Sequence, residues 1–205
     1  MEADDRVREA NHRCSNDLQL VVALLTMMAR RAERSDQSDL LLTAAHRVGL
    51  LANARAAMVR GNGLNLSTAL RNLCEALQSL AEPRDVMVAL SADCEPDGLN
   101  DAAVMAASMA VNELATNAIK HAFADGASGT ITVTLADAGH DKLLISVEDD
   151  GVTMPSDPSA SREQGGMGLK LADRLVAQHG RLVVPTDGGK RFEIHLRHQR
   201  PARVN

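Results

Sequence analysis

The spacing of apolar residues changes at the GNG sequence of residues 61–63, and this change divides the chain into two parts that must fold differently. Before it, apolar residues recur at helical spacing over about 9–34 and 39–60, on either side of the polar segment RSDQSD. After it, helical stretches alternate with segments of period two, which is the pattern of half-buried β-strands. We therefore expect an α+β chain, with a helical hairpin at residues 1–62 and a mixed α/β domain at residues 63–205.

The two helices of the hairpin cannot enclose a hydrophobic core by themselves. Their apolar stripes need a partner, and the same hairpin from a second copy of the chain would complete a four-helix bundle. We therefore expect a homodimer formed through the N-terminal helices.

Composition argues against several classes of protein. The net charge of -5 and the aromatic content of 1% provide neither a basic surface nor a stacking platform for nucleic acid. The longest apolar run, VVALLTMMA, is about half of what a membrane span requires. Three separated cysteines without a CxxC pair favour a reducing compartment, and the histidines lack the HExxH spacing of a zinc hydrolase. We expect a soluble, cytoplasmic protein.

The second part is expected to contain three helices and five strands. The expected helices cover 65–80, with Ser67 as the N-cap, then 100–123 and 169–178. The expected strands cover 85–93, 130–137, 142–149, 181–186 and 190–197, and AGHD and DGG form turns between neighbouring strands.

The long helix at 100–123 carries an unusual polar face in VNELATNAIKHAF. Solvated helix faces favour Glu, Lys, Gln and Arg, whereas Asn, Thr and His are poorer helix formers. A plain solvated face is the alternative, but Glu113 and Asn117, four residues apart, can converge on one ligand. An amide oxygen with a carboxylate suits magnesium that also holds phosphate oxygens, and Lys120 can meet the phosphate charge. This face indicates a nucleotide site.

Two acidic residues, Asp149 and Asp150, precede Gly151 in VEDDGVTMP. An ordinary turn explains them when they are taken alone. In a nucleotide site, one carboxylate near the end of the sheet would accept a hydrogen bond from an exocyclic amine such as that of adenine.

Glycines cluster before the last helix, in GGMGLKL. Gly165, Gly166 and Gly168 leave the backbone amides and the positive end of the helix open to phosphate groups. Such turns are common, so the order of the three motifs carries more weight than this one alone.

From about residue 100 to residue 197 the chain resembles the GHKL (Bergerat) ATP-binding domain of histidine kinases. NELATNAIKHAF is similar to its N box, VEDDGV to its first glycine box and GGMGLKL to its second. The resemblance implies an α/β sandwich with a mixed sheet that binds ATP beneath a mobile lid at residues 152–165. The chain departs from the family at Thr153, where a second glycine is usual, and it has no phenylalanine box in the lid.

The resemblance also implies roles for individual residues. Asn117 would bind magnesium with Glu113 as a polar or basic partner, Lys120 would meet phosphate, and His121 would pack near the nucleotide. Asp149 would read the adenine. Gly151, Gly166 and Gly168 would let the backbone approach the nucleotide.

Near the N-terminus, HRCSNDLQ is similar to the HRxxNxLQ dimerisation and phosphoacceptor box of HisKA_2 type histidine kinases. This resemblance makes His12 the phosphoacceptor, because a neutral imidazole can attack the γ-phosphorus of ATP and hold a labile phosphoramidate. Arg13 can steady the phosphate or form a surface ion pair. Asn16, one turn beyond His12, can orient a water against an aspartyl phosphate. Gln19 continues that face, and a solvent-facing role explains it equally well.

We therefore expect a histidine kinase of a two-component system, in which ATP phosphorylates His12 and a response regulator aspartate takes the phosphoryl group. One alternative is a histidine phosphotransfer protein or response-regulator phosphatase with little kinase activity. Another is a nucleotide-dependent binding module, such as an anti-sigma or switch protein. Labelling by ATP separates the first alternative from the kinase, and full function after His12→Ala would favour the second.

Overall fold

The structure is a computed structural model that describes part of the 205-residue chain. The described residues are 2–32, 34, 37–38, 40–42, 44–45, 47–49, 52, 64–96, 98–123, 127–152, 166–186 and 189–198. The chain divides into two compact units, residues 1–64 and 65–205. The separate functions expected for the parts before and after the GNG sequence stay predictions.

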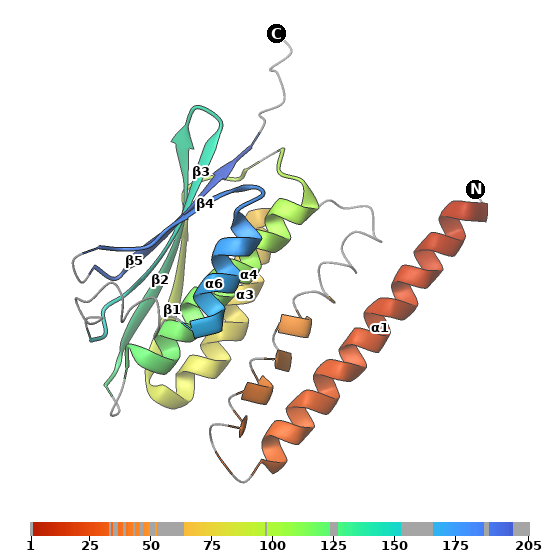
Figure 1. Cartoon of the computed structure of the whole chain (residues 1–205), viewed down its shortest axis with the longest axis horizontal. Helices are drawn as coiled ribbons and strands as arrows, with labels where there is room; N and C mark the ends of the chain where they lie inside the picture. The colour runs from red at the N-terminus through yellow and green to blue at the C-terminus, as the bar shows by residue number, and fades with distance from the viewer. Residues whose placement is uncertain are drawn as a thin grey trace. The chain divides into compact units, whose positions relative to one another are not determined.

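The first unit is helical. Helix α1 covers Glu2–Arg31 and begins earlier than the apolar periodicity indicated (Figure 1). The described residues between Gln37 and Ala52 also have helical backbone. A Cβ atom added to Gly49 would lie 3.8 Å from Cγ2 of Val22, so this second stretch packs against α1. The expected helical N-terminal region is confirmed.

The second unit contains one five-stranded mixed sheet in the order β1-β2-β3-β5-β4. Its strands are β1 (Val86–Ala92), β2 (Gly129–Gly139), β3 (Lys142–Asp149), β4 (Gly180–Val183) and β5 (Arg191–Arg197). Strand β1 pairs with β2 in parallel, and the remaining pairs are antiparallel. The hairpin expected around AGHD is the β2–β3 pair, so the alternating pattern predicted these strands correctly.

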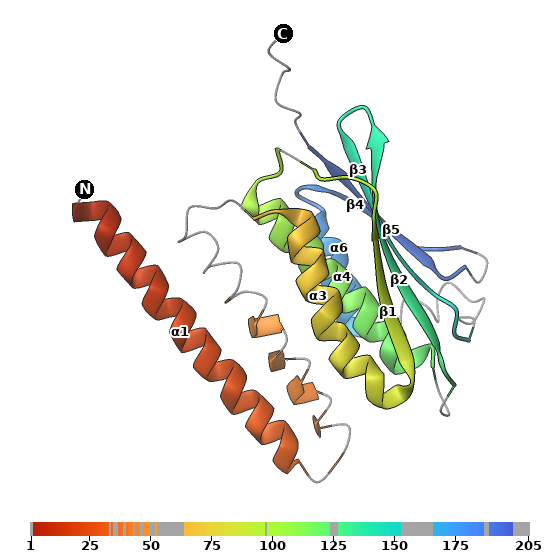
Figure 2. The same ribbon diagram turned by 180° about the vertical axis from the view of Figure 1, so that it is seen from behind.

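Three helices pack on one face of the sheet and make an α/β sandwich (Figures 1 and 2). They are α3 (Leu66–Ala81), α4 (Asp101–His121) and α6 (Gly166–Val176), and a short 3-10 helix, η1 (Glu82–Arg84), follows α3. Alternate residues of the strands face these helices, so Ile131, Val133 and Leu135 of β2 are fully buried. The core is almost entirely aliphatic, as a chain with only two phenylalanines requires.

Helix α3 begins at Leu66 because the side chain of Asn65 accepts a hydrogen bond from the Thr68 backbone amide at 2.9 Å. The expected N-cap, Ser67, is wrong by two positions. Ser67 lies inside the helix, is buried, and donates its hydroxyl to the Cys94 carbonyl at 3.3 Å. A hydroxyl and an amide cap satisfy the same orphan amides, so the sequence alone did not separate them.

Helix α4 is held at both ends and lies between α3 and α6 on the face of the sheet. Asn100 Oδ1 accepts from the Ala103 amide at 2.8 Å at its start, and Arg84 Nη1 donates to the Ile119 carbonyl at 3.1 Å near its end. Small side chains such as Ala107 and Ala110 are completely buried along it. Close packing therefore fixes the rotation of α4 and with it the directions of its polar residues.

Among the described residues, none of the helices combines the length and apolar character of a membrane span. Among the described residues, Cys14, Cys74 and Cys94 form no disulfide. Burial raises the pKa of Cys74 to about 11, so this thiol stays protonated at neutral pH and acts as a small core residue.

Candidate functional site

The polar face of α4 is buried at residues 112–116, in the C-terminal half of the helix. Asn112, Glu113 and Thr116 are only 1%, 3% and 9% exposed. A solvated face, the plain alternative for this stretch, is therefore wrong for these three residues. Burying an amide and a carboxylate costs free energy unless each finds a polar partner, so the stretch is favoured only where a ligand or a network uses it.

Asn112 gives a direct sign of such a use. Its Oδ1 atom has no hydrogen-bond partner among the residues that the structure describes. Leaving a buried acceptor unsatisfied costs about 1–3 kcal/mol, and native proteins rarely keep one without an ion, a water or a ligand beside it. The orphaned oxygen therefore indicates that the region near Asn112 receives a further polar group.

The same helix face opens to the surface toward its C-terminal end. Asn117 and Lys120 are partly exposed and His121 is exposed. Glu113 and Asn117 are one turn apart, so a carboxylate and an amide lie at neighbouring positions of one helix. The structure thus places the predicted α4 residues along a path from the interior to the surface.

The acidic turn after β3 lies against the end of α4. The Gly151 amide donates to Asp149 Oδ1 at 3.1 Å, and the Thr130 amide donates to Asp150 Oδ1 at 2.7 Å. The Val152 amide donates to the carbonyl of Ala122, the residue after α4, at 2.8 Å. These three bonds fix the turn and bring Asp149 to the end of α4 that carries Asn117.

Gly151 is required by this contact. A Cβ atom at this position would lie 2.2 Å from the Ala122 carbonyl oxygen and 2.7 Å from its carbonyl carbon. Both are backbone atoms, which cannot move aside as a side chain can. The first glycine motif therefore serves the docking of the turn onto α4.

The Asp149 carboxyl is half-buried, and burial raises its pKa above the ordinary value for aspartate. The Gly151 amide and the charge of Lys190 oppose this shift, while Asp150 and Glu148 add to it. The result is a carboxyl group that is only partly solvated. Such a group is suited to accept a hydrogen bond from a ligand.

The sequence predicts that Gly166 and Gly168 lie in a turn before the last helix. In the structure helix α6 begins at Gly166, so both glycines lie in its first turn. This correction keeps their chemistry, because the first amides of a helix have no partner within the helix. Glycine at two of these positions puts no side chain between these amides and an anion. Gly165 lies outside the described residues.

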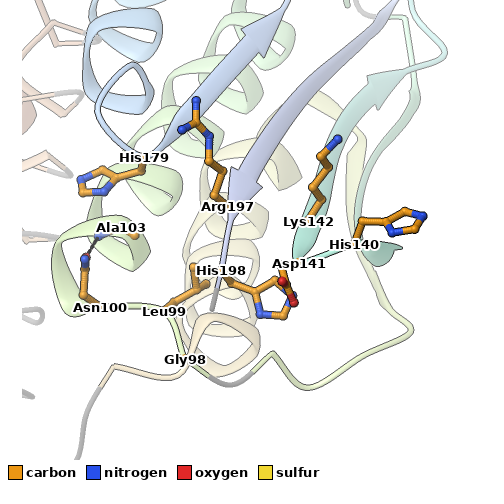
Figure 3. Close-up of a pocket in the computed structure, with 10 residues that line it drawn as sticks. All are labelled: Gly98, Leu99, Asn100, Ala103, His140, Asp141, Lys142, His179, Arg197 and His198. Carbon is orange, nitrogen blue, oxygen red and sulfur yellow. Dashed lines mark hydrogen bonds between the residues drawn. The ribbon is translucent and has the colours of Figure 1, made fainter. Parts of the chain in front are cut away.

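The start of α6 lies at the same end of the sandwich as Asn117. Helices α4 and α6 pack along each other. His179, just after α6, lies beside Asn100 and Ala103 at the start of α4 (Figure 3). The two helices are therefore antiparallel, and Gly166 and Gly168 lie toward the C-terminal end of α4. The structure thus brings all three sequence motifs to one end of the second unit.

A cavity of about 680 Å³ lies at the opposite end, around the tip of the β2–β3 hairpin. Its lining includes His140, Lys142, His179, Arg197 and His198 (Figure 3). None of the residues predicted from the motifs lines it. This cavity is therefore separate from the candidate nucleotide site.

His12 and Asn16 lie on α1, four residues apart along the helix. Their side chains are outside the described residues, as are Thr153 and the rest of the expected lid from 153 to 165. The roles expected for these residues stay predictions.

Sequence reasoning missed one residue at the site, Lys190. Its ammonium group donates to the carbonyl oxygen of Gly151, 39 residues away in sequence. The alternating pattern of KRFEIHLR predicts a strand, but no local signal shows which group the lysine at its start will contact.

The chain matches two family models in succession. Residues 9–81 match HisKA_2, described as histidine kinase, and residues 103–200 match HATPase_c, described as histidine kinase-, DNA gyrase B- and HSP90-like ATPase. The first match includes α3, so this helix belongs to the HisKA_2 region by sequence and to the sandwich by packing.

Individual relatives are similar over most of this chain. The blue-light-activated histidine kinase 2 of Erythrobacter litoralis is 28% identical over 92% of this chain and 55% of its own length. The sensor histidine kinase PdtaS of Mycobacterium tuberculosis is 28% identical over 85% of this chain and 35% of its own length. The chain thus spans about half or less of these relatives.

The fold is also similar to a solved structure, the histidine kinase domain of the blue-light-activated histidine kinase of Erythrobacter litoralis. The TM-score is 0.68 at 23% identity, covering 95% of this chain and 94% of that one. This likeness supports the arrangement of helices and mixed sheet described above.

The contact between Gly151 and Ala122 generates a stability prediction. Gly151→Ala should lower the free energy of unfolding by about 2 kcal/mol or more, because the new methyl group collides with backbone and breaks the Val152–Ala122 hydrogen bond. Urea denaturation of the purified chain measures this. Gly139→Ala is the control: its Cβ meets nothing within 4 Å, so it carries only the strain of a positive φ, about 1 kcal/mol. Equal losses in the two variants would contradict the prediction.

Proposed function

The chain belongs to the histidine kinase family, with a HisKA_2 region followed by a HATPase_c region, and we propose that it acts as the kinase core of a two-component system. In this proposal ATP in the second unit phosphorylates His12, and a response regulator aspartate then receives the phosphoryl group. The observation that supports it most strongly is the buried polar stretch of α4, with its orphaned Asn112 oxygen, beside the fixed Asp149 turn.

The residues present fit a magnesium nucleotide. The described residues contain no group of three or more His, Cys, Asp and Glu side chains that could enclose a metal ion. Magnesium needs no such group, because it is commonly held by one or two protein oxygens together with phosphate oxygens and water. Asn117 would be the magnesium ligand, with Glu113 as its polar or basic partner. When bound, the ion neutralises charge on the phosphates.

The phosphate groups would meet positive charge and amide donors from two helices. Lys120 offers an ammonium group on α4, and the first amides of α6 lie around Gly166 and Gly168. His121 would pack near the nucleotide. Asp149 would accept a hydrogen bond from the 6-amino group of adenine, and Gly151 would hold the turn in place for it.

The phosphorylation step follows from imidazole chemistry. A neutral ring nitrogen of His12 would attack the γ-phosphorus in line, the bond from that phosphorus to the bridging oxygen would break, and ADP would leave. The attacking ring would form an N–P bond and release its proton to solvent. The phosphoramidate then has enough transfer potential to pass its phosphoryl group to a carboxylate.

The first unit supports a dimer. Several large apolar side chains of α1 are exposed in the single chain, and these are Leu20, Val21, Leu24, Met27 and Met28. Such a stripe on a long helix is typical of a surface that a second copy covers. We propose a homodimer through these helices, with His12 and Asn16 offered to a response regulator receiver domain. Asn16 would orient the water that hydrolyses the aspartyl phosphate.

The proposed reaction predicts the labelling pattern of three variants. The wild-type chain with γ-labelled ATP and magnesium should become labelled, and His12→Gln should take up no label while still binding ATP. Asn117→Ala should reduce the rate about 100-fold or more through loss of the metal ligand. Asn72→Ala, an exposed asparagine on α3, is the matched control and should behave as wild type. Normal labelling of His12→Gln would refute the assignment of the phosphoacceptor.

Asp149 generates a pH prediction. The ionised carboxylate accepts the adenine amine more strongly than the neutral acid does, and burial raises the pKa of Asp149. ATP affinity should therefore fall with decreasing pH from a point above the ordinary aspartate range. Protonation of the ATP phosphates also changes affinity as the pH falls, but it does so equally for wild type and Asp149→Asn. The ratio of the two proteins' dissociation constants for ATP therefore isolates the protonation of Asp149. Calorimetry should show this ratio approaching one as the pH falls; a constant ratio would contradict the role of Asp149.

A further inference from the structure

Lys190 lies beside Asp149 because of the register of the sheet. Strand β5 is antiparallel to β3, with Phe192 opposite Val147 and Arg191 opposite Glu148. The next step along both strands brings Lys190 level with Asp149. The Lys190 ammonium donates to the carbonyl oxygen of Gly151, and its charge acts on the Asp149 carboxyl. Lys190 is thus part of the turn that contains the candidate adenine acceptor.

The two charged groups leave hydrogen-bonding capacity open. An ammonium group has three donors, and the Gly151 carbonyl accepts one of them. One oxygen of Asp149 accepts the Gly151 amide. Within the described part of the chain, Lys190 and Asp149 form no ion pair with each other. Counting only contacts with described residues, the turn therefore presents an unused acceptor on Asp149 and unused donors on Lys190 at neighbouring positions.

This pairing matches one edge of a purine. Adenine carries an amino donor at position 6 and, next to it, the acceptor nitrogen N1. Guanine and hypoxanthine carry the opposite pair, an oxygen acceptor at position 6 and an N–H donor at N1. The Asp149 acceptor and the Lys190 donor therefore complement the edge of adenine. The same two groups would face an acceptor and a donor of their own kind in guanine or hypoxanthine.

We infer that Lys190 is a specificity residue that donates a hydrogen bond to adenine N1 while Asp149 accepts from the 6-amino group. This inference rests on the proposed nucleotide site. It adds a second, charged contact to the base, and a hydrogen bond from a charged donor is worth more than one from a neutral group.

A purely structural role makes a different prediction. If Lys190 only fastened the turn after β3 through Gly151, its loss would weaken the binding of every nucleotide in the same proportion. A contact with N1 instead makes the effect depend on that single ring atom. The two roles are separated by a nucleotide that lacks N1.

The experiment compares ATP with 1-deaza-ATP, in which a C–H group replaces N1, by calorimetry on the whole chain with magnesium. Wild type should bind ATP about tenfold or more tightly than 1-deaza-ATP, as expected for a hydrogen bond to a charged group. Lys190→Met should bind the two within about twofold, and Lys190→Arg should keep part of the preference. Lys142→Met, an exposed lysine at the opposite end of β3, should match wild type.

Either of two results would overturn the inference about Lys190 and leave the proposed function standing. One is equal binding of ATP and 1-deaza-ATP by wild type, and the other is an unchanged preference in Lys190→Met with a normal unfolding curve. Failure of wild type to bind ATP at all would instead overturn the proposed function, and this inference with it.

Discussion

The burial of polar side chains on α4 is the constraint on which the second unit depends. The helix is enclosed by α3, α6 and the sheet, and its alanines allow the close approach that fixes its rotation. That rotation places Asn112 and Glu113 out of water in the same stretch of helix that reaches the surface at Asn117. A helix selected only for stability would bury apolar residues at these positions, since an unsatisfied buried amide is costly. The orphaned Asn112 oxygen therefore indicates that a further polar group, such as a ligand or a water, lies beside this stretch.

The remaining architecture positions two other groups at the same end of the sandwich. Strand β3 ends in Asp149, and the bond from Val152 to Ala122 ties the following turn to the end of α4. Helix α6 runs antiparallel to α4, so its first turn at Gly166 also lies at this end. A carboxylate, a polar helix face and the first amides of α6 therefore lie at one end of the sandwich, and these are groups that can hold a magnesium nucleotide.

Much of this arrangement was predictable from local patterns, and the errors have physical reasons. Period-two alternation located the β2–β3 hairpin correctly because one face of each strand is buried. The N-cap of α3 was misplaced because Ser67 and Asn65 are both good caps, and only tertiary packing buried the serine. The start of α6 was misplaced because glycines disfavour helix in isolation, whereas Gly166 and Gly168 are helical here. Lys190 was not found, since its contact with Gly151 depends on the register of β5 against β3.

A crystal structure of the whole chain with magnesium and a non-hydrolysable ATP analogue tests the central claim most directly. The account predicts the adenine at Asp149, the metal at Asn117 and phosphate oxygens at the first amides of α6, with the buried part of α4 otherwise unchanged. Nucleotide bound only in the cavity around His179, or the region between Asn117 and Gly166 filled by the protein's own side chains, would contradict it.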